Sequence, residues 1–242
     1  MKKNLLRAGL FTLALSLAAP IMASAQEINS IYVTPKLIYS HQVGDMNPSR
    51  WSNGAWTANA LGGEETDNSF GLGLSVGADL GYYYDLPMRV ELEYAYRGKA
   101  EFGQGPSVVL GSVPLMASHS FDITAHSLMA NAFFDFNNDS MFTPYIGAGL
   151  GLAYLDTTYR ASIQNGTTAT VTTNNDNWNF AWNVGAGVAY HLSDNMALDL
   201  GYRYVDLGTA EAGSAIVSNF TGSSSVDYTA HEVNVGLRFS GF

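Results

Sequence analysis

Residues 69 to 82 alternate between apolar side chains, most of them large, and small or polar ones, and residues 178 to 192 do the same. In the first stretch the even positions hold Phe70, Leu72, Leu74, Val76, Ala78, Leu80 and Tyr82, and the odd ones hold mainly glycine, with serine and aspartate. Successive side chains of a β-strand point to opposite faces, so a period of two predicts strands with one apolar and one small, polar face. A helix, which repeats about every 3.6 residues, would mix the two sets.

Eight segments of this kind can be placed along the chain. We predict strands at residues 30–41, 69–84, 88–101, 118–136, 142–158, 178–192, 196–209 and 227–239. Three connections (85–87, 137–141, 193–195) are tight turns, whereas four (42–68, 102–117, 159–177, 210–226) are long and rich in Gly, Ser, Thr and Asn. Short and long connections in alternation are typical of outer-membrane barrels. The predicted fold is all-β, an eight-stranded antiparallel transmembrane β-barrel with short periplasmic turns and four long extracellular loops.

The inward face decides between a membrane barrel and a water-soluble one. A soluble eight-stranded barrel of the lipocalin kind encloses its apolar face and wets its outside. The large apolar set of this chain would overfill such a lumen, whereas the glycine-rich and charged set fits. The apolar set is therefore expected to face lipid. Glycines 147, 149, 151, 185 and 187 either make room inside for Tyr145 and arginine side chains or mark bends in the sheet.

The first residues predict export. Three positive charges precede an apolar stretch of about 15 residues, which is followed by Ala23-Ser24-Ala25. The stretch is shorter than the ~20 residues that a spanning helix needs, and the whole pattern is typical of a cleaved signal peptide. The predicted domains are a signal peptide at 1–25 and a barrel at 26–242, located in the outer membrane after passage through the periplasm. Without Lys2, Lys3 and Arg7 the chain keeps 8 basic residues against 21 acidic ones, a formal charge of −13, so we expect no nucleic-acid partner.

Aromatic residues gather at both ends of the predicted strands. Two interfacial girdles flanking an apolar band are what membrane interfaces favour. The turn-side girdle is predicted to hold Tyr82, Tyr84, Phe134, Phe136, Phe142 and Tyr190, and the loop-side girdle Tyr94, Tyr96, Tyr154, Trp178, Tyr202 and Tyr204.

Charged residues recur on the inward face. By parity this face carries Lys36, Arg89, Arg97, Arg203 and Arg238 with Asp79, Glu91, Glu93, Asp199 and Glu232. Charges in a narrow, low-dielectric lumen must be paired, so we predict an ion-pair network that fills the barrel. The alternative is a small porin-like pore, although aqueous channels need about 16 strands.

No motif in the chain predicts catalysis, a cofactor or a metal site. The sequence has no cysteine and no phosphate-binding or zinc-protease motif. Of its five histidines only His191 has a serine, Ser193, at the spacing of two that one strand face requires, and this pair lies at a periplasmic turn. We therefore expect no enzyme, with a lipid-modifying outer-membrane enzyme as the alternative.

Three segments, 143–151, 183–190 and 193–208, resemble the opacity-type outer-membrane proteins, eight-stranded surface antigens related to the transmembrane domain of OmpA. The resemblance implies folding by the outer-membrane assembly machinery, contact with outer-membrane lipid and lipopolysaccharide, and loops that in some relatives contact host cells. Trp51 and Trp56 in the first loop either form such a surface patch or rest on the bilayer surface. Family members end in an alternating strand closed by an aromatic residue, as Phe239 would do here, whereas Phe242 is one position out of phase.

Overall fold

The computed structural model describes residues 30–52, 57–60, 62–104, 109–110, 113–114, 116–165, 167–217 and 220–241. The predicted signal peptide at 1–25 lies outside these residues, and its cleavage stays a prediction. Within the described part no helix combines the length and the apolar character needed to cross a membrane.

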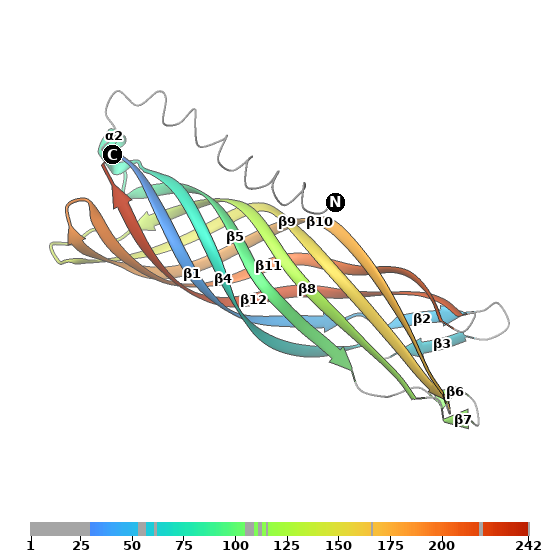
Figure 1. Cartoon of the computed structure of the whole chain (residues 1–242). Coiled ribbons are helices and arrows are strands. Elements are labelled where there is room, and N and C mark those ends of the chain that lie inside the picture. The colour runs from blue at the N-terminus through green and yellow to red at the C-terminus, as the bar shows by residue number, and fades with distance from the viewer. Residues whose placement is uncertain are drawn as a thin grey trace.

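Eight long strands form a closed antiparallel barrel (Figure 1). The strands are β1 (Ile31–Met46), β4 (Gly63–Asp79), β5 (Met88–Gln104), β8 (Met116–Asp135), β9 (Phe142–Asn165), β10 (Thr167–Ser193), β11 (Met196–Val217) and β12 (Phe220–Ser240). They neighbour one another in this order, and β12 pairs with β1 through partners such as Lys36 with Gly236. The predicted fold class is confirmed.

Shorter elements lie at the two ends of the barrel. The helical turn α2 (Gly81–Tyr84) connects β4 to β5, and Asp85 ends it in the left-handed conformation at φ 55°. At the opposite end, the hairpin of β2 (Ser49–Ser52) and β3 (Thr57–Ala60) lies in the first long connection, and the small pair β6 (Val109–Leu110) and β7 (Val113–Pro114) lies in the second.

The strands are longer than the sequence led us to expect. Segments 159–177 and 210–226, predicted as loops, are mostly strand: β9 and β10 stay paired up to Asn165 and Thr167, and β11 and β12 up to Val217 and Phe220. The prediction of loops there was wrong, because strand pairing continues beyond the membrane through both segments, helped in 159–177 by the strong β propensity of its threonines. Two of the four long connections are therefore extensions of the barrel wall.

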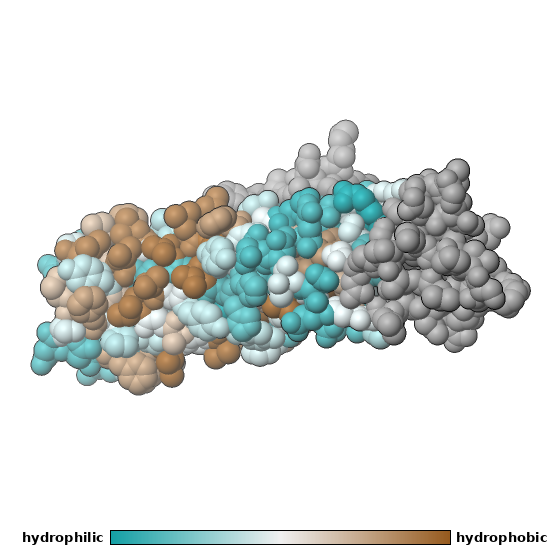
Figure 2. Space-filling view, turned by 90° about the horizontal axis from the view of Figure 1, so that it is seen from below, coloured by the Kyte–Doolittle hydropathy of each residue, from teal (hydrophilic) through white to brown (hydrophobic). Residues whose placement is uncertain are grey.

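The outer surface has two zones. Figure 2 shows apolar residues over the turn-side part of the barrel and hydrophilic residues over the part that follows it. On β10, Phe180 and Val184 are exposed in the first zone, and Asn174 and Asp176 in the second. The outer extension is the part of the strands that lies further from the turns than the loop-side aromatic residues Tyr96, Trp178 and Tyr202.

Two of the eight ladders do not continue into the outer extension. Pairing between β4 and β5 ends at Gly71 with Arg97, and pairing between β10 and β11 ends at Trp182 with Asp206. The other ladders continue, so the extension consists of two sheets, β4-β1-β12-β11 and β5-β8-β9-β10, separated by two seams.

Candidate functional site

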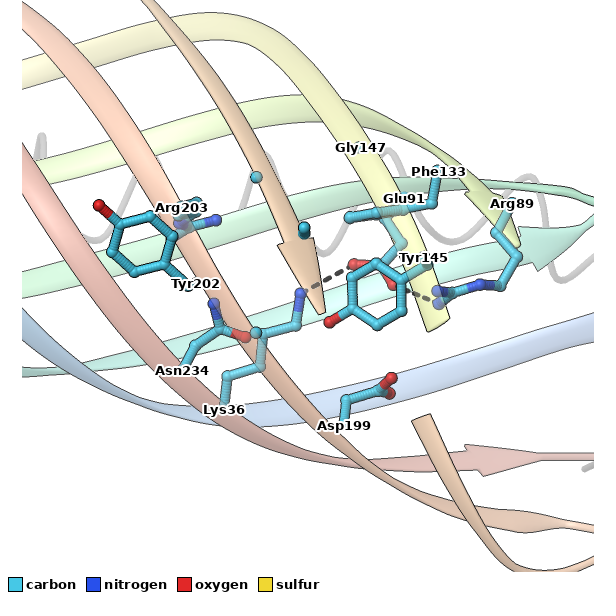
Figure 3. A pocket seen from close by; sticks show the side chains of 13 residues that line it. Lys36, Arg89, Glu91, Phe133, Tyr145, Gly147, Asp199, Tyr202, Arg203 and Asn234 are labelled. Atoms are coloured by element: carbon cyan, nitrogen blue, oxygen red, sulfur yellow. Dashed lines mark hydrogen bonds and ion pairs between the residues drawn. The ribbon is translucent and has the colours of Figure 1, made fainter. Parts of the chain in front are cut away.

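A chain of alternating charges crosses the lumen in the part of the barrel that carries the apolar outer surface. Each charged group contacts one or two of opposite sign, at 3.5 Å or less. In order of contact the chain runs Asp135, Arg89, Glu91, Lys36, Glu93, Arg203, Glu232 and Arg97. Figure 3 shows the Lys36 amine and the Arg89 guanidinium converging on Glu91.

Hydrogen bonds complete the network at its ends. Arg89 donates two hydrogen bonds to the Asp135 carboxylate, from Nε at 2.7 Å and from Nη2 at 3.0 Å. At the other end Arg97 Nη1 donates to Ser127 Oγ at 2.9 Å. Such bidentate contacts between arginine and a carboxylate are strong and geometrically specific. The buried charges therefore have the partners that a low-dielectric interior requires.

A separate pair lies near the turn end. Arg238 contacts Asp199 through Nη2 at 2.7 Å and Nε at 3.0 Å. The Arg238 guanidinium lies 5.2 Å from the centre of the Tyr32 ring, and the Tyr32 hydroxyl donates to Glu91 at 3.0 Å. Tyr32 thus links the separate pair to the charge chain.

Of the ten charged residues placed in the lumen by sequence, Asp79 lies outside this network. Its Oδ1 accepts a hydrogen bond from the backbone N–H of Gly81 at 2.8 Å, so it serves the turn at α2. Asp135, which the sequence analysis missed, is an acidic partner of Arg89 in the network. The same parity rule could have found Asp135, because the odd positions of β8 point inward.

Glycines create the space that the large inward side chains occupy. A Cβ at Gly187 would lie 2.4 Å from the Tyr145 ring, and one at Gly185 would lie 2.7 Å from Cβ of Arg203. A cavity of about 30 Å³ remains between Lys36, Arg89 and Tyr145. This volume is enough for one or two water molecules.

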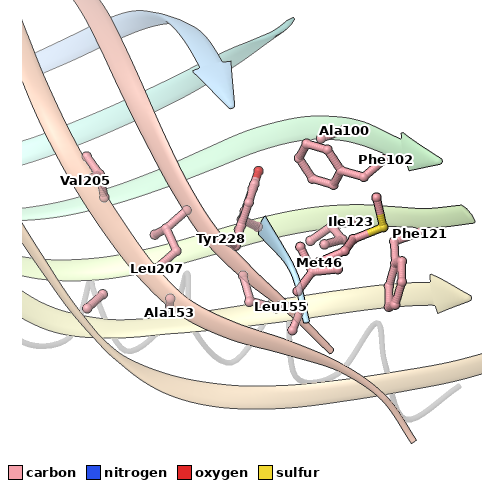
Figure 4. Close-up of a cluster of buried hydrophobic side chains, with 14 of the residues drawn as sticks. Met46, Ala100, Phe102, Phe121, Ile123, Ala153, Leu155, Val205, Leu207 and Tyr228 are labelled. Atoms are coloured by element: carbon pink, nitrogen blue, oxygen red, sulfur yellow. The ribbon is translucent and has the colours of Figure 1, made fainter. Parts of the chain in front are cut away.

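The lumen of the outer extension is filled differently. It holds apolar side chains that are almost fully buried, among them Phe102, Phe121, Ile123, Leu155, Val205, Leu207 and Tyr228 (Figure 4). The Phe102 and Tyr228 rings pack edge to face with centroids 5.9 Å apart. The expectation of a polar interior was drawn from the charged inward positions, and this second filling was missed although most of its residues, such as Ile123, Leu155 and Leu207, lie within the predicted strands.

A short polar layer separates the two fillings. The Tyr228 hydroxyl donates to Gln42 Oε1 at 2.6 Å, and Gln42 Nε2 donates to Ser69 Oγ. Glu232, the last carboxylate of the charge chain, accepts from Ser40 Oγ at 3.3 Å on the same side of β1. The polar side chains at the boundary thus form hydrogen bonds with one another.

Aromatic residues lie on the outer surface at two levels. On the turn side Tyr84, Phe134, Phe136 and Phe142 are exposed, and Tyr190 packs against Phe142 at 4.8 Å between ring centroids. On the loop side Tyr96, Trp178 and Tyr202 are exposed, with Tyr94 and Tyr204 half-buried. Tyr39, Phe70 and Trp182, which the sequence analysis left out, are exposed as well. The side chain of Tyr82 is not described.

The spacing of the two levels fits a bilayer. Trp178 and Tyr190 are separated by 12 positions on β10, which is roughly 40 Å along a strand and roughly 30 Å along the membrane normal at the usual tilt. Tyr154 departs from the prediction of an interfacial side chain, because it is only 1% exposed, packs against Trp178 and donates to Asp176 Oδ2 at 3.1 Å.

In the described residues, His191 and His231 each contact a neighbouring hydroxyl group. No group of three or more metal-ligating side chains occurs there. His191 Nε2 contacts Thr143 Oγ1 at 3.2 Å, and His231 Nδ1 contacts the Tyr202 hydroxyl at 2.7 Å. The side chains of Trp51 and Trp56 and the whole of Phe242 lie outside the described parts, whereas Phe239 closes the barrel by pairing with Val33 and Met196.

Burial changes the pKa of two groups in the outer extension. It lowers the pKa of His119 on β8, because the charged imidazolium loses hydration. It raises the pKa of the Tyr159 hydroxyl for the same reason, since the charged phenolate is disfavoured.

Comparison with known proteins agrees with this architecture. Residues 11–239 match the family described as "Outer membrane protein beta-barrel domain", and the chain belongs to this family. It is an outer-membrane β-barrel protein. Over 145 residues it is 32% identical to the outer membrane protein PagN of Salmonella typhimurium, a match that spans 60% of each chain. A putative adhesin of Rickettsia bellii is 27% identical over 74% of this chain and 83% of its own length.

A solved structure with a similar fold is that of Neisserial surface protein A, which is 20% identical, with a TM-score of 0.44 over 87% of this chain and 97% of the other.

Proposed function

We propose that this protein is a non-enzymatic surface barrel whose membrane part is a closed anchor and whose outer extension offers a binding surface to host or environmental ligands. The observation that carries the proposal is the double filling of the lumen, ionic in the membrane part and apolar beyond it. Two successive plugs favour an anchor over a channel. The adhesin name of the Rickettsia relative supports a binding role at the surface.

The first test concerns the lumen. Purified protein refolded into planar bilayers is expected to give no stable conductance, because the cavity of about 30 Å³ near Lys36 has room for only one or two water molecules. The control is the heat-modifiable electrophoretic shift of the same sample, which shows that the barrel is folded. A stable conductance that survives Arg203→Ala would overturn the plugged lumen and make a small pore the better proposal.

The second test concerns the outer extension. The chain has no cysteine, so a single introduced thiol reports its own accessibility. In intact cells a membrane-impermeant maleimide is expected to label Thr172→Cys, exposed on the extension, and to leave Asp194→Cys, exposed at a turn, unlabelled. Labelling of the second variant alone would show that the barrel is inserted with the opposite orientation.

The proposed partners follow from the same arrangement. The exposed apolar zone would contact outer-membrane lipid, the aromatic residues near Trp178 would lie at the level of the lipopolysaccharide head groups, and the assembly machinery would insert the barrel. The rival proposal is a lipid-modifying enzyme. Mass spectra of lipid A from cells with and without the gene are expected to be identical, and a mass difference would favour the enzyme.

A further inference from the structure

The two seams of the outer extension are bridged to different degrees. In an antiparallel sheet, an edge that lacks a neighbouring strand leaves its backbone N–H and C=O groups without partners. Each seam has two such edges, β10 and β11 at one seam and β4 and β5 at the other. How the side chains bridge each seam decides whether it can accept another strand.

Asparagine side chains bridge the seam between β10 and β11. Asn175, Asn177 and Asn179 lie at a spacing of two on β10, and their side-chain amides donate across the seam to backbone carbonyls of β11. The acceptors are Glu211 at 2.9 Å, Thr209 at 2.8 Å and 3.0 Å, and Leu207 at 3.1 Å. This series of bonds replaces the missing ladder and occupies the edge of β11.

Among the described residues, the carboxylate of Asp67 bridges the seam between β4 and β5. Asp67 Oδ1 accepts from the N–H of Asn68 on its own strand, and Asp67 Oδ2 accepts from the N–H of Glu101 on β5, both at 2.8 Å. On the side away from the seam, each strand keeps its pairing: β4 stays paired with β1 up to Gly63, and β5 stays paired with β8 up to Gln104.

The direction of the seam-facing groups follows from the ladder. Leu80 N–H donates to the carbonyl of Met88 at 2.9 Å, and hydrogen-bonded positions recur at every second residue of an antiparallel strand. Even-numbered residues of β4 therefore direct their backbone toward β5, which leaves the N–H and C=O groups of Glu64 and Thr66 facing the seam. No described strand pairs with them there.

The same chain shows that a free edge in the extension accepts a strand. Where β1 ends at Met46, the edge of β12 is taken over by β2, which pairs through Ser52 with Thr221. The barrel therefore already extends its sheet by addition of a strand beyond the membrane.

The charge around the seam selects the partner. Carboxylates of Glu64, Glu65, Asp67 and Glu101 lie along it, and its cation Lys99 is paired with Glu101 and lies 3.5 Å from Asp122. An incoming strand with lysine or arginine would gain charge-assisted contacts, and an acidic strand would be repelled.

We propose that the β4/β5 seam of the outer extension is a strand-addition site for an extended, basic polypeptide segment. The backbone of the segment pairs with the seam-facing edge of β4, and its basic side chains contact the carboxylates around the seam. The proposal rests on the proposed function in one respect, the exposure of the extension to the outside of the cell.

The test measures binding of a fluorescent peptide of alternating lysine and threonine to the detergent-refolded full chain by anisotropy. Thr66→Pro removes a seam-facing N–H without touching the ladder to β1, and it is expected to weaken binding about tenfold or more, whereas the matched Thr66→Val stays within about twofold. The double variant Glu64→Gln with Glu101→Gln is expected to weaken binding and its dependence on salt.

Peptide chemistry provides an arm that needs no variant. The same peptide methylated on every second backbone nitrogen keeps its charge but cannot pair, and it is expected not to bind the unmodified protein. Two peptide results would overturn the proposal: equal binding of the methylated peptide or of an alternating glutamate-threonine peptide, or no binding of the basic peptide itself. Normal folding and binding of Thr66→Pro would overturn it as well.

Self-association that Thr66→Pro abolishes would also overturn it in favour of a second copy. Maleimide labelling of Thr172→Cys in cells tests exposure independently, so failure of peptide binding with normal labelling rejects only the seam site.

Discussion

The membrane part and the outer extension share the same eight strands but have opposite distributions of polarity. In the membrane part of β11, Arg203 points inward and Tyr202 is exposed outside; a few residues further on, Val205 and Leu207 point inward and Asp206 faces out. The inward parity of the strand does not change over these residues. What changes is the medium outside the wall.

The comparison shows that the outer medium determines what the lumen holds. Where the wall faces lipid, apolar side chains gain nothing by turning inward, so the inside can be built from glycine and paired charges. Where the wall faces water, the hydrophobic effect requires an apolar inside, as in a soluble sandwich. The polar layer of Gln42, Ser69 and Tyr228 lies where the two arrangements meet.

The largest effect is expected from removing one charge in the membrane part. Glu232 is fully buried between Arg97 and Arg203, so Glu232→Gln leaves two guanidinium groups facing a neutral amide. The free energy of unfolding is expected to fall by about 3–5 kcal/mol, measured by denaturant titration in lipid vesicles.

The control for this variant is Glu211→Gln on the exposed surface of the extension, expected to change stability by less than about 0.5 kcal/mol. Combining Glu232→Gln with Arg203→Gln should recover part of the loss, since one unpaired cation is removed. A loss below about 1 kcal/mol for the single variant would mean that water already solvates this part of the lumen.

A smaller and more local effect is expected in the extension. Phe102 is fully buried against Tyr228, and Phe102→Ala creates a cavity worth about 3 kcal/mol in the apolar core. Limited proteolysis is expected to cut the extension faster, while the heat-modifiable shift that reports the membrane part remains. The exposed neighbour Gly103→Ala is the control. Loss of the shift itself would show that the two parts unfold as one unit.

Parity in the sequence was sufficient to predict the membrane part, and it failed beyond it for a physical reason. Lipid requires strict alternation, so the two faces of residues 69–79 and 178–192 could be assigned, whereas the prediction that the first strand continues to residue 84 was wrong, because residues 81–84 form the helical turn α2. In 159–177 and 210–226 the described exposed residues are mostly Thr, Ser, Asn and acidic residues, a composition shared by loops and by water-exposed strands. Parity alone places Asp135 inward, but its pairing with Arg89 depends on the register of the two strands as well.

The next largest effect on stability is expected from removing the asparagine side chains that bridge β10 and β11. Asn177→Ala with Asn179→Ala removes the amide bonds to Leu207 and Thr209 on β11, at a cost of about 1–2 kcal/mol confined to that seam. Amide hydrogen exchange on β11 beyond Val205 is expected to accelerate. Asn174→Ala, which removes an outward side chain bonded only to Thr158, should leave this exchange unchanged. Equal acceleration in both variants would mean that the asparagines do not bridge the seam.

The smallest effect concerns pH in the extension. Burial lowers the pKa of His119 below its usual value of about 6.5, so the unfolded chain takes up a proton there more readily than the folded one. The contribution of His119 to stability is therefore present above pH 6.5 and lost as the pH falls toward 5. Because the group is partly exposed, screening keeps the effect below about 1 kcal/mol.

Comparison of the wild type with His119→Gln at pH 7 and pH 5 isolates this contribution, since the other histidines titrate in both proteins. The stability of the variant relative to the wild type is expected to be higher at pH 5 than at pH 7. The opposite trend would mean that folding favours the charged imidazole, and His119 would then lie in the field of the acidic outer surface and not in that of the apolar core.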